Sequence, residues 1–263
     1  MGKYSTTFKN SLSVFIQYRL NLGLILVSQL VSLSGLVFLW LSIYSSGQQM
    51  GNYGLQEIIT YYVLVTLIAT IIGDGIGMAF DVVEDINRGE IIHYLLKPFS
   101  YVKYRFLTLV GAITINLMFM APLIIIGGYL MRQSFSFPSA SGWVYFCITL
   151  SFAILFEFLI FMLASLSSFW VVRGSSFIYA TILITGLFDG SLIPLDLFPY
   201  WAYHITSYLP FQFIIFTPIQ AFLENIYSPA KLFSVAMVWI IILLLLLLWV
   251  WKRGVKKLEG VGR

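Results

Sequence analysis

The chain of 263 residues is 60% hydrophobic and only 10% charged, and its formal net charge is +4. This composition excludes an ordinary soluble domain. The small basic excess does not indicate a nucleic-acid partner, because the basic residues cluster beside apolar runs. Several of these runs are long enough to cross a bilayer, where backbone groups must pair within their own segment. The sequence therefore predicts an all-α integral membrane protein.

The first 19 residues come before the first apolar run and show apolar side chains at helical spacing. Tyr4, Phe8, Leu12 and Phe15 recur every three or four residues, and polar side chains largely fill the other side. This pattern predicts an amphipathic helix over 1–19 that lies along the inner membrane surface. A frayed cytoplasmic lead-in is the alternative.

Six membrane spans are predicted from the apolar runs. They lie near residues 20–44, 58–80, 106–130, 143–170, 176–195 and 230–251. With this arrangement only Arg132 and Lys231 of the 15 basic residues fall on one side of the membrane. Because basic residues concentrate in cytoplasmic segments, both termini are predicted to be cytoplasmic.

The connection between the second and third spans, 81–105, holds eight of the 26 charged residues and one of the two histidines. No proline lies between 82 and 97, so a short helix is expected there, and Pro98 would end it. Such a helix would place Glu84, Arg88 and Ile92 on one stripe and Ile91, Leu95 and Phe99 on another. It would rest its apolar side on the span ends and present charges to the cytoplasm. A solvated loop held by Glu84–Arg88 pairing is the alternative.

The connection between the fifth and sixth spans is rich in proline and aromatic residues. Five of the eight prolines fall within 189–229, so short helical pieces are expected there. Aromatic side chains of this segment suit the membrane interface. We therefore predict a re-entrant or surface-lying helical hairpin over 196–229 on the outer face. The alternative is that Tyr200–Phe222, which is uncharged, forms a seventh span and puts the termini on opposite sides.

Two carboxylates fall inside predicted spans. Glu157 lies near the middle of the fourth span, where it must be protonated, paired or in contact with water. It is expected either to line a polar cavity or proton path or to form a structural hydrogen bond. Asp74 lies near the inner end of the second span, where Ala69, Gly73 and Gly77 recur every fourth residue. This spacing favours close helix packing over local unwinding at Asp74.

Motifs for catalysis and metal binding are missing from the sequence. It contains no HExxH, GxSxG or P-loop pattern, so a Walker-type ATP site is not expected in this chain. His93 and His204 fall on opposite sides of the membrane in the predicted topology, which argues against a metal site built from both. No catalytic residue and no metal ligand is therefore predicted.

Four stretches of the sequence carry a resemblance to a known family: RGEIIHYLLKPFSY at 88–101, LASLSSFWVVRG at 163–174, GSLIPLDLFP at 190–199 and LPFQFIIFTPIQAFL at 209–223. They resemble, in the family's order, segments of a bacterial branch of the ABC-2 type ABC transporter permease family, whose members are six-span exporter permeases. The resemblance spans essentially the whole chain. Lys97 stands where arginine is common in this branch, which weakens any expectation of a bidentate contact there.

The resemblance implies a permease subunit of an ATP-driven exporter in the bacterial cytoplasmic (inner) membrane. Such permeases pair as homodimers or heterodimers and sit on two ABC ATPase subunits, which bind ATP and Mg; this chain itself would hold no cofactor. The expected cargo is an amphipathic or lipid-like substrate, such as a drug, peptide or glycolipid, moved outward by alternating access. Membrane lipids are the remaining expected partners.

The resemblance also assigns roles to particular segments. The amphipathic N-terminal helix would be the connecting helix, the loop 81–105 would hold the coupling helix, and the outer hairpin would be the external gate. The residues expected at the ATPase contact are Glu84, Arg88, Gly89, Glu90, His93 and Lys97. The residues expected at the gate are Tyr200, His204, Phe211 and Gln212.

Two other functions compete with the exporter. A membrane-embedded enzyme acting on lipid usually needs clustered Asp or His residues at a membrane face. Here the acidic patch of Asp81, Glu84 and Asp85 has nothing near it in the sequence that completes such a site. A carrier that works without an ATPase is the other alternative, and no internal repeat between the two halves of the chain supports it.

Overall fold

The computed structural model describes residues 19–45, 51, 53–130, 137–226 and 228–261, and within these ranges the chain is helical with no β-strand. The α-helices are α2 (Arg19–Ser45), α3 (Leu55–Ile72), α4 (Asp74–Asn87), α5 (Ile91–Leu95), α6 (Tyr101–Leu130), α7 (Ala140–Ser165), α8 (Ser175–Phe188), α9 (Tyr200–Thr206), α10 (Phe216–Phe222) and α11 (Pro229–Val261). Three short 3-10 helices are η1 (Leu166–Phe169), η2 (Leu195–Leu197) and η3 (Pro210–Phe213). The amphipathic helix predicted over 1–19 lies outside the described residues apart from Arg19.

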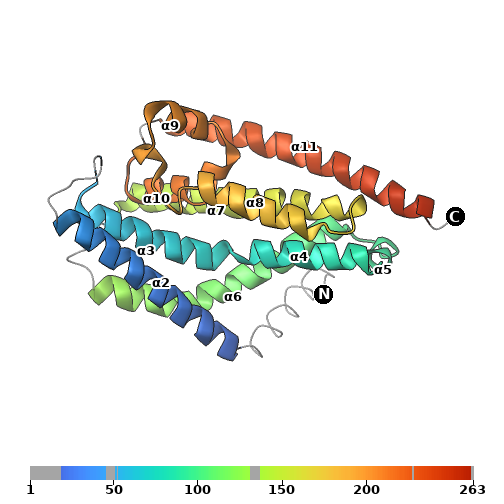
Figure 1. The fold of residues 1–263 in the computed structure, drawn as a ribbon, viewed down its shortest axis with the longest axis horizontal. Helices are drawn as coiled ribbons and strands as arrows, with labels where there is room; N and C mark the ends of the chain where they lie inside the picture. The colour runs from blue at the N-terminus through green and yellow to red at the C-terminus, as the bar shows by residue number, and fades with distance from the viewer. Residues whose placement is uncertain (1–18, 46–50, 52, 131–136, 227, 262–263) are drawn as a thin grey trace.

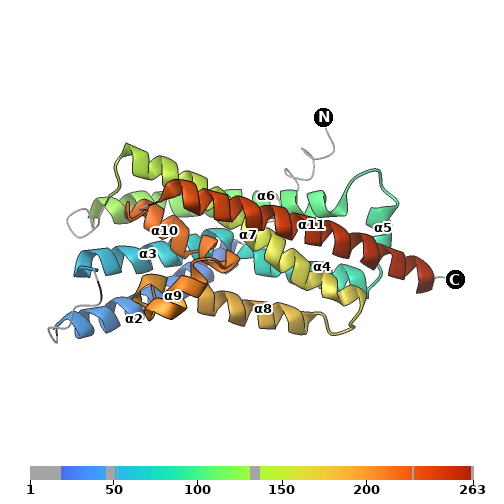
Figure 2. The same cartoon turned by 90° about the horizontal axis from the view of Figure 1, so that it is seen from above.

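The long helices run roughly side by side along one axis, and the short ones gather at the two ends of the bundle (Figure 1). α5 and the C-terminal end of α11 lie at one end, whereas α9 and α10 lie towards the other (Figures 1 and 2). Helix α7 packs against α4, α8, α10 and α11 and forms the centre of the core. Its middle turns bury large apolar side chains such as Phe156, Leu159 and Met162.

Three helical segments of the described chain are long and apolar enough to cross a membrane. They are Leu55–Asn87, Ala140–Phe169 and Pro229–Leu258, of 33, 30 and 30 residues. A hydrocarbon core of about 30 Å needs about 20 helical residues. Shorter apolar helices cover Ser34–Ser45 and Ser175–Phe188. The helical composition and these segments are those of a membrane protein.

The predicted second span is longer than expected and is interrupted. α3 ends at Ile72 and α4 begins at Asp74, with Gly73 between them. A Cβ on Gly77 would meet no described atom within 4 Å, so the close packing expected of the stripe of Ala69, Gly73 and Gly77 stays a prediction. The helix is interrupted at Gly73.

The prediction of one continuous helix within 82–97 is wrong. α4 continues to Asn87, the chain turns at residues 88–90, and α5 then covers only Ile91–Leu95. Gly89 adopts a φ of +73°, a left-handed conformation that ends a right-handed helix. The non-helical part of 81–105 is therefore confined to the short stretches on either side of α5, since α6 begins at Tyr101.

The connection between α8 and α11 consists of short helical pieces. α8 ends at Phe188, earlier than the end predicted for the fifth span, because Asp189 accepts a hydrogen bond from the Ser191 amide at 2.7 Å and Gly190 turns the chain with a φ of +86°. α9 and α10 have seven residues each, so neither can cross a hydrocarbon core alone. Every residue of α10 is buried, mainly against α7.

Candidate coupling and gating sites

The predicted coupling residues lie together at the end of the bundle that holds α5. The charged side chains of Glu84, Arg88, Glu90 and Lys97 are exposed, and so is the imidazole of His93. Arg88 pairs with Glu84 at 2.6 Å, as expected for charges four residues apart on α4. Both side chains are more than half exposed, so this pair contributes little stability.

The turn around α5 is not purely polar. Ile91 is fully buried, but Ile92, Leu95 and Leu96 are 50%, 39% and 80% exposed. The expectation that Leu95 would rest on the span ends with Ile91 is therefore wrong. Because α5 has only five residues, it buries one apolar side chain and leaves the others exposed beside the charges. The surface that results, with exposed apolar side chains bordered by charges, is typical of protein contact sites.

A buried ion-pair network holds the helix ends behind this turn. The Arg105 guanidinium of α6 contacts Asp81 at 3.2 Å and also pairs with Asp85 of α4. Its Nε donates to the Tyr101 hydroxyl at 3.0 Å, and Tyr101 in turn donates to Asp85. Arg105 and Asp85 are both buried. The sequence did not predict this network, because its partners lie on both sides of the loop and only their charges mark them.

Aromatic stacking connects the network to α5 and α11. The Trp251 ring of α11 stacks on Tyr101 at 5.5 Å with an interplanar angle of 7°. Tyr94 of α5 meets Tyr101 edge to face at 5.3 Å, and burial raises the pKa of Tyr94 to about 12. Gly254 lies so close to Phe169 of η1 that a Cβ would overlap the ring at 2.1 Å. The α5 turn is thus tied to α4, α6 and α11.

The predicted gate residues occupy two different environments. Tyr200 is 83% exposed on α9, and its ring stacks on His204 with 6.0 Å between centroids. Gln212 is buried in η3, where its amide donates to the Ser207 carbonyl. Phe211 is half-buried and stacks on Phe188 of α8 at 6.3 Å. Tyr200 and His204 are therefore exposed, whereas Phe211 is half-buried and Gln212 is buried.

Three tyrosines of α3 and the turn before it hold the hairpin in place. The Tyr61 hydroxyl donates to the Gly190 carbonyl at 2.7 Å, and the Tyr62 hydroxyl donates to the Leu192 carbonyl at 2.8 Å. Tyr53 donates to a carboxylate oxygen of Asp196 at 2.7 Å. Sequence reasoning missed these anchors, because its only signal was a pair of adjacent tyrosines in an apolar run.

Gly190 is the point where the chain leaves α8 for the hairpin. A Cβ at this position would lie 2.8 Å from the Tyr61 hydroxyl and 2.9 Å from Cβ of Phe216. Phe216 is held beside this turn because its backbone amide donates a hydrogen bond to the Asp189 carbonyl at 2.8 Å. Only glycine fits here, because both its positive φ and its close neighbours exclude a side chain.

The two carboxylates predicted to lie within the membrane, Asp74 and Glu157, lie beside the break between α3 and α4. Asp74 accepts a hydrogen bond from the Asn116 amide of α6 at 2.8 Å. Glu157 of α7 is buried against Gly75, where a Cβ would lie 2.6 Å from the glutamate Cγ. Within the described part of the chain the Glu157 side chain forms no hydrogen bond or ion pair. The structural hydrogen bond, which was one of the two predicted alternatives for Glu157, is therefore not seen among the described residues.

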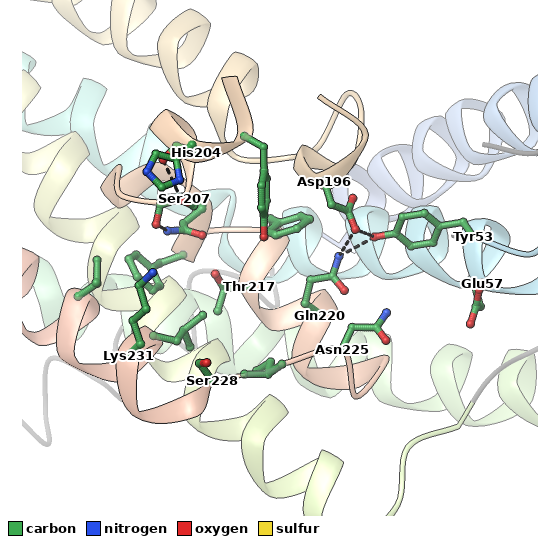
Figure 3. A pocket seen from close by; sticks show the side chains of 17 residues that line it. Tyr53, Glu57, Asp196, His204, Ser207, Thr217, Gln220, Asn225, Ser228 and Lys231 are labelled. Atoms are coloured by element: carbon green, nitrogen blue, oxygen red, sulfur yellow. Dashed lines mark hydrogen bonds between the residues drawn. The ribbon is translucent and has the colours of Figure 1, made fainter. Parts of the chain in front are cut away.

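A cavity of about 570 Å³ lies where the hairpin meets the first turns of α3 and α11 (Figure 3). Two of the four predicted gate residues, His204 and Gln212, line it. Phe213 and Phe216 contribute apolar wall, and amide and hydroxyl side chains contribute polar wall. Its volume is in the usual range of small-ligand sites, roughly 300–1,000 Å³.

Comparison with known proteins agrees with the helical architecture. Residues 30–262 match the family model described as ABC-2 family transporter protein, which is most of the chain. No curated protein matches the chain. Among the residues that the structure describes, no group of three or more His, Cys, Asp or Glu side chains is arranged to hold a metal ion. The match over residues 30–262 shows that the chain belongs to the ABC-2 family of transporter proteins.

Proposed function

We propose that the chain is the permease subunit of an ATP-driven exporter in a bacterial cytoplasmic membrane. Two permeases, identical or related, would pair and sit on two separate ATPase subunits that bind ATP and Mg. Membership of the ABC-2 family supports a permease that works with ATPase partners. The proposed cargo is amphipathic or lipid-like, such as a drug, peptide or glycolipid, and it moves outward.

The proposed topology has six spans with both termini in the cytoplasm. The spans would be α2, α3 with α4, α6, α7, α8 and α11. The C-terminal end of α11 carries Lys252, Arg253, Lys256 and Lys257 and lies at the same end of the bundle as α5 (Figure 1). Basic residues favour the cytoplasmic side, so this end supports an inward orientation for the α5 turn. The hairpin would then face outward.

The observation that carries the proposal is the exposed α5 turn and its ties to the helices behind it. Ile92, Leu95 and Leu96 offer apolar contact area, and Arg88 and Glu90 offer charges that set the register of a partner. Gly89 has open space around the position of a Cβ, so a partner backbone can approach it closely. The proposed occupant of this surface is a cleft of the ATPase.

A continuous chain of contacts connects the α5 turn to the hairpin. Tyr94 contacts Tyr101, and Arg105 joins α6 to α4 through Asp81 and Asp85. α4 continues, across the break at Gly73, into α3, whose Tyr61 and Tyr62 hold the start of the hairpin. A tilt of α3 and α4 driven by the ATPase would thus move the gate.

Reversing the charges of the turn tests this function. We expect Arg88→Glu combined with Glu90→Arg to reduce the ATPase activity that co-purifies with tagged permease and to abolish export, while the permease still inserts. Lys256→Glu is the matched control, because it changes an exposed charge at the same end of the bundle outside the turn. Normal export by the double variant with its ATPase bound would refute the proposed coupling site.

A further inference from the structure

The cavity under the hairpin has opposite charges at its two sides. Figure 3 shows Asp196, Tyr53 and Glu57 on one side, His204, Ser207 and Lys231 on the other, and Thr217, Gln220 and Asn225 between them. The carboxylates come from η2 and α3, whereas the lysine comes from the first turn of α11. Different elements of the fold therefore supply the two charges.

The acidic side has a hydrogen-bond acceptor without a donor. The Gln220 amide nitrogen donates to the Tyr53 hydroxyl at 2.6 Å and to Asp196 at 3.3 Å, which fixes the orientation of the amide. Its carbonyl oxygen, Oε1, has no hydrogen-bond partner among the described residues, although Gln220 is only 6% exposed. Buried carbonyl oxygens are nearly always paired. This oxygen has almost no accessible surface, so the group that faces a ligand on this side is the exposed Asp196 carboxylate.

The basic side has a cation without a carboxylate partner. Lys231 is exposed to the cavity, and its Nζ lies 5.1 Å from the centre of the Tyr208 ring. No carboxylate of the described residues lies within ion-pair distance of it. His204 lines the same side, with its ring against Tyr208 at 5.4 Å. An anionic ligand group fits this side.

The hydroxyl of Thr217 lies between the two sides. Thr217 is 1% exposed, and its Oγ1 has no hydrogen-bond partner among the described residues. Most other buried threonine hydroxyls, such as those of Thr149 and Thr185, donate to a backbone carbonyl of their own helix at 2.8 Å. The Thr217 Oγ1 atom has almost no accessible surface, so a ligand would pair with this hydroxyl only after a small movement of the side chains around it.

We propose that this cavity binds a zwitterionic group, with its ammonium at the Asp196–Gln220 side and its phosphate or carboxylate at the Lys231 side. A ligand with only a negative charge would face Asp196 and Glu57, and a ligand with only a positive charge would face Lys231. Like charges brought together in an interface are unfavourable, so a ligand with both charges is favoured over either. A phosphoethanolamine lipid headgroup and a free amino acid or peptide share this chemistry.

The inference rests on the proposed function only for the outward orientation of the hairpin. In that orientation Lys231 begins the last span, so the cavity lies at the depth of the outer headgroups. A lipid headgroup therefore has direct access to it. The binding test uses the permease without an ATPase, so failure to bind the probes would not refute the proposed exporter function. Equally, a failed test of the coupling site at Arg88 and Glu90 would not refute ligand binding in the cavity.

The test measures binding of three soluble probes to the full chain in phosphatidylglycerol nanodiscs. Phosphoethanolamine carries both charges, ethanolamine only the positive one and inorganic phosphate only the negative one. By ligand-observed NMR we expect phosphoethanolamine to bind about tenfold more tightly than either single-charge probe, the effect of one charge-assisted hydrogen bond. Equal affinities for all three, or no binding of phosphoethanolamine, would overturn the proposal.

Two variants assign the ends of the ligand. Lys231→Gln should weaken phosphoethanolamine about tenfold without weakening ethanolamine, whereas Asp196→Asn should weaken ethanolamine without weakening phosphate. Lys252→Gln, at the far end of α11, is the matched control and should change nothing. If Lys231→Gln binds phosphoethanolamine as the unmodified chain does, the anion site is refuted.

The middle of the cavity is tested by Thr217→Val, which is isosteric and breaks no hydrogen bond of the described structure. We expect weaker phosphoethanolamine binding with no loss of thermal stability, and Thr217→Ser should restore binding. Thr149→Val is the control for a buried threonine outside the cavity. Unchanged binding by Thr217→Val would remove this residue and the middle of the site from the proposal.

Lipid and soluble ligands are separated by changing the nanodisc. If phosphatidylethanolamine occupies the cavity through its headgroup, adding it to the nanodisc should abolish binding of free phosphoethanolamine. If free probe binds equally in both nanodiscs, the site takes soluble zwitterions instead. Either result supports the zwitterionic site, provided that Lys231→Gln weakens binding in the phosphatidylglycerol nanodisc.

Discussion

The two ends of the bundle are held together by different interactions. At the end with α5, Arg105 forms charge-assisted hydrogen bonds with Asp81 and Asp85, and aromatic rings pack around them. At the end with the hairpin, Tyr61 and Tyr62 donate to backbone carbonyls that carry no net charge. Of the three tyrosine anchors there, only Tyr53 donates to a carboxylate, that of Asp196. Hydrogen bonds to charged groups contribute about 1.5–3 kcal/mol and neutral ones about 0.5–1.5 kcal/mol.

This difference fits the proposed exporter, in which an ATPase would act at one end and a gate would open at the other. In that proposal the end at α5 would transmit movement without deforming, and its network joins α4, α5, α6 and α11. The hairpin would exchange contacts during each cycle, and the neutral hydrogen bonds from Tyr61 and Tyr62 can be exchanged at small energetic cost. The cavity beside the hairpin further lowers the number of contacts that hold the hairpin, since the Thr217 hydroxyl there has no hydrogen-bond partner among the described residues.

Removing the arginine of the network should have the largest effect on stability. Arg105→Met would leave Asp85 buried and unpaired, so we expect a loss of about 3–5 kcal/mol in the free energy of unfolding. Thermal unfolding of the detergent-purified permease, monitored by size-exclusion chromatography, would measure this loss of stability. Lys103→Met is the control, because this neighbour is exposed, and it should change stability by less than about 0.5 kcal/mol. Equal effects of the two variants would show that the end at α5 is not held by the ion pairs.

A change at the start of the hairpin should have an intermediate effect. Gly190→Ala adds a side chain at a φ of +86° and in contact with Tyr61 and Phe216, so we expect a loss of about 1–3 kcal/mol together with reduced export. Gly186→Ala is the matched control on α8, where a Cβ meets no described atom within 4 Å. This control should be neutral or slightly stabilising, because alanine favours helix. If both variants behave alike, the turn at Gly190 does not anchor the hairpin.

The pH dependence of the hairpin should show the smallest effect. Burial of the Asp196 carboxylate beside Tyr53 raises its pKa, and the hydrogen bonds from Tyr53 and Gln220 only partly oppose this. The folded chain therefore keeps the proton to higher pH than the unfolded chain, so stability falls as the pH rises from about 4 through the folded pKa. Asp196→Asn removes this decrease, and its stability relative to the unmodified chain should rise over that range. A difference that stays constant with pH would show that Asp196 does not titrate between the two states.

The sequence predicted the helical class and the places where polar segments interrupt apolar ones. Composition and charge were sufficient for this, because the lipid environment restricts which residues can form long helices. The same reasoning placed exposed charges around Arg88 and short helical pieces between Pro199 and Pro218, and the structure has both. These features depend on local sequence alone.

What the sequence did not predict depends on contacts between distant segments. The partners Arg105 and Asp81 are 24 residues apart, and Tyr61 and Gly190 are 129 apart. No local pattern marks such pairs, so both networks were missed. The break at Gly89 was missed for a different reason: a missing proline permits a helix, but one glycine with a positive φ ended it.

The central claim is that the end at α5 moves as one unit while the hairpin changes its contacts. Pairs of spin labels in a Cys147→Ser background test it, with one pair at Lys103 and Lys252 and the other at Tyr200 and Leu183, all of them exposed positions. Electron paramagnetic resonance would measure both distances in the permease–ATPase complex, without nucleotide and with ATP trapped by vanadate. We expect the distance between Tyr200 and Leu183 to change and that between Lys103 and Lys252 to stay constant. A change at the α5 end with a fixed hairpin would contradict the account.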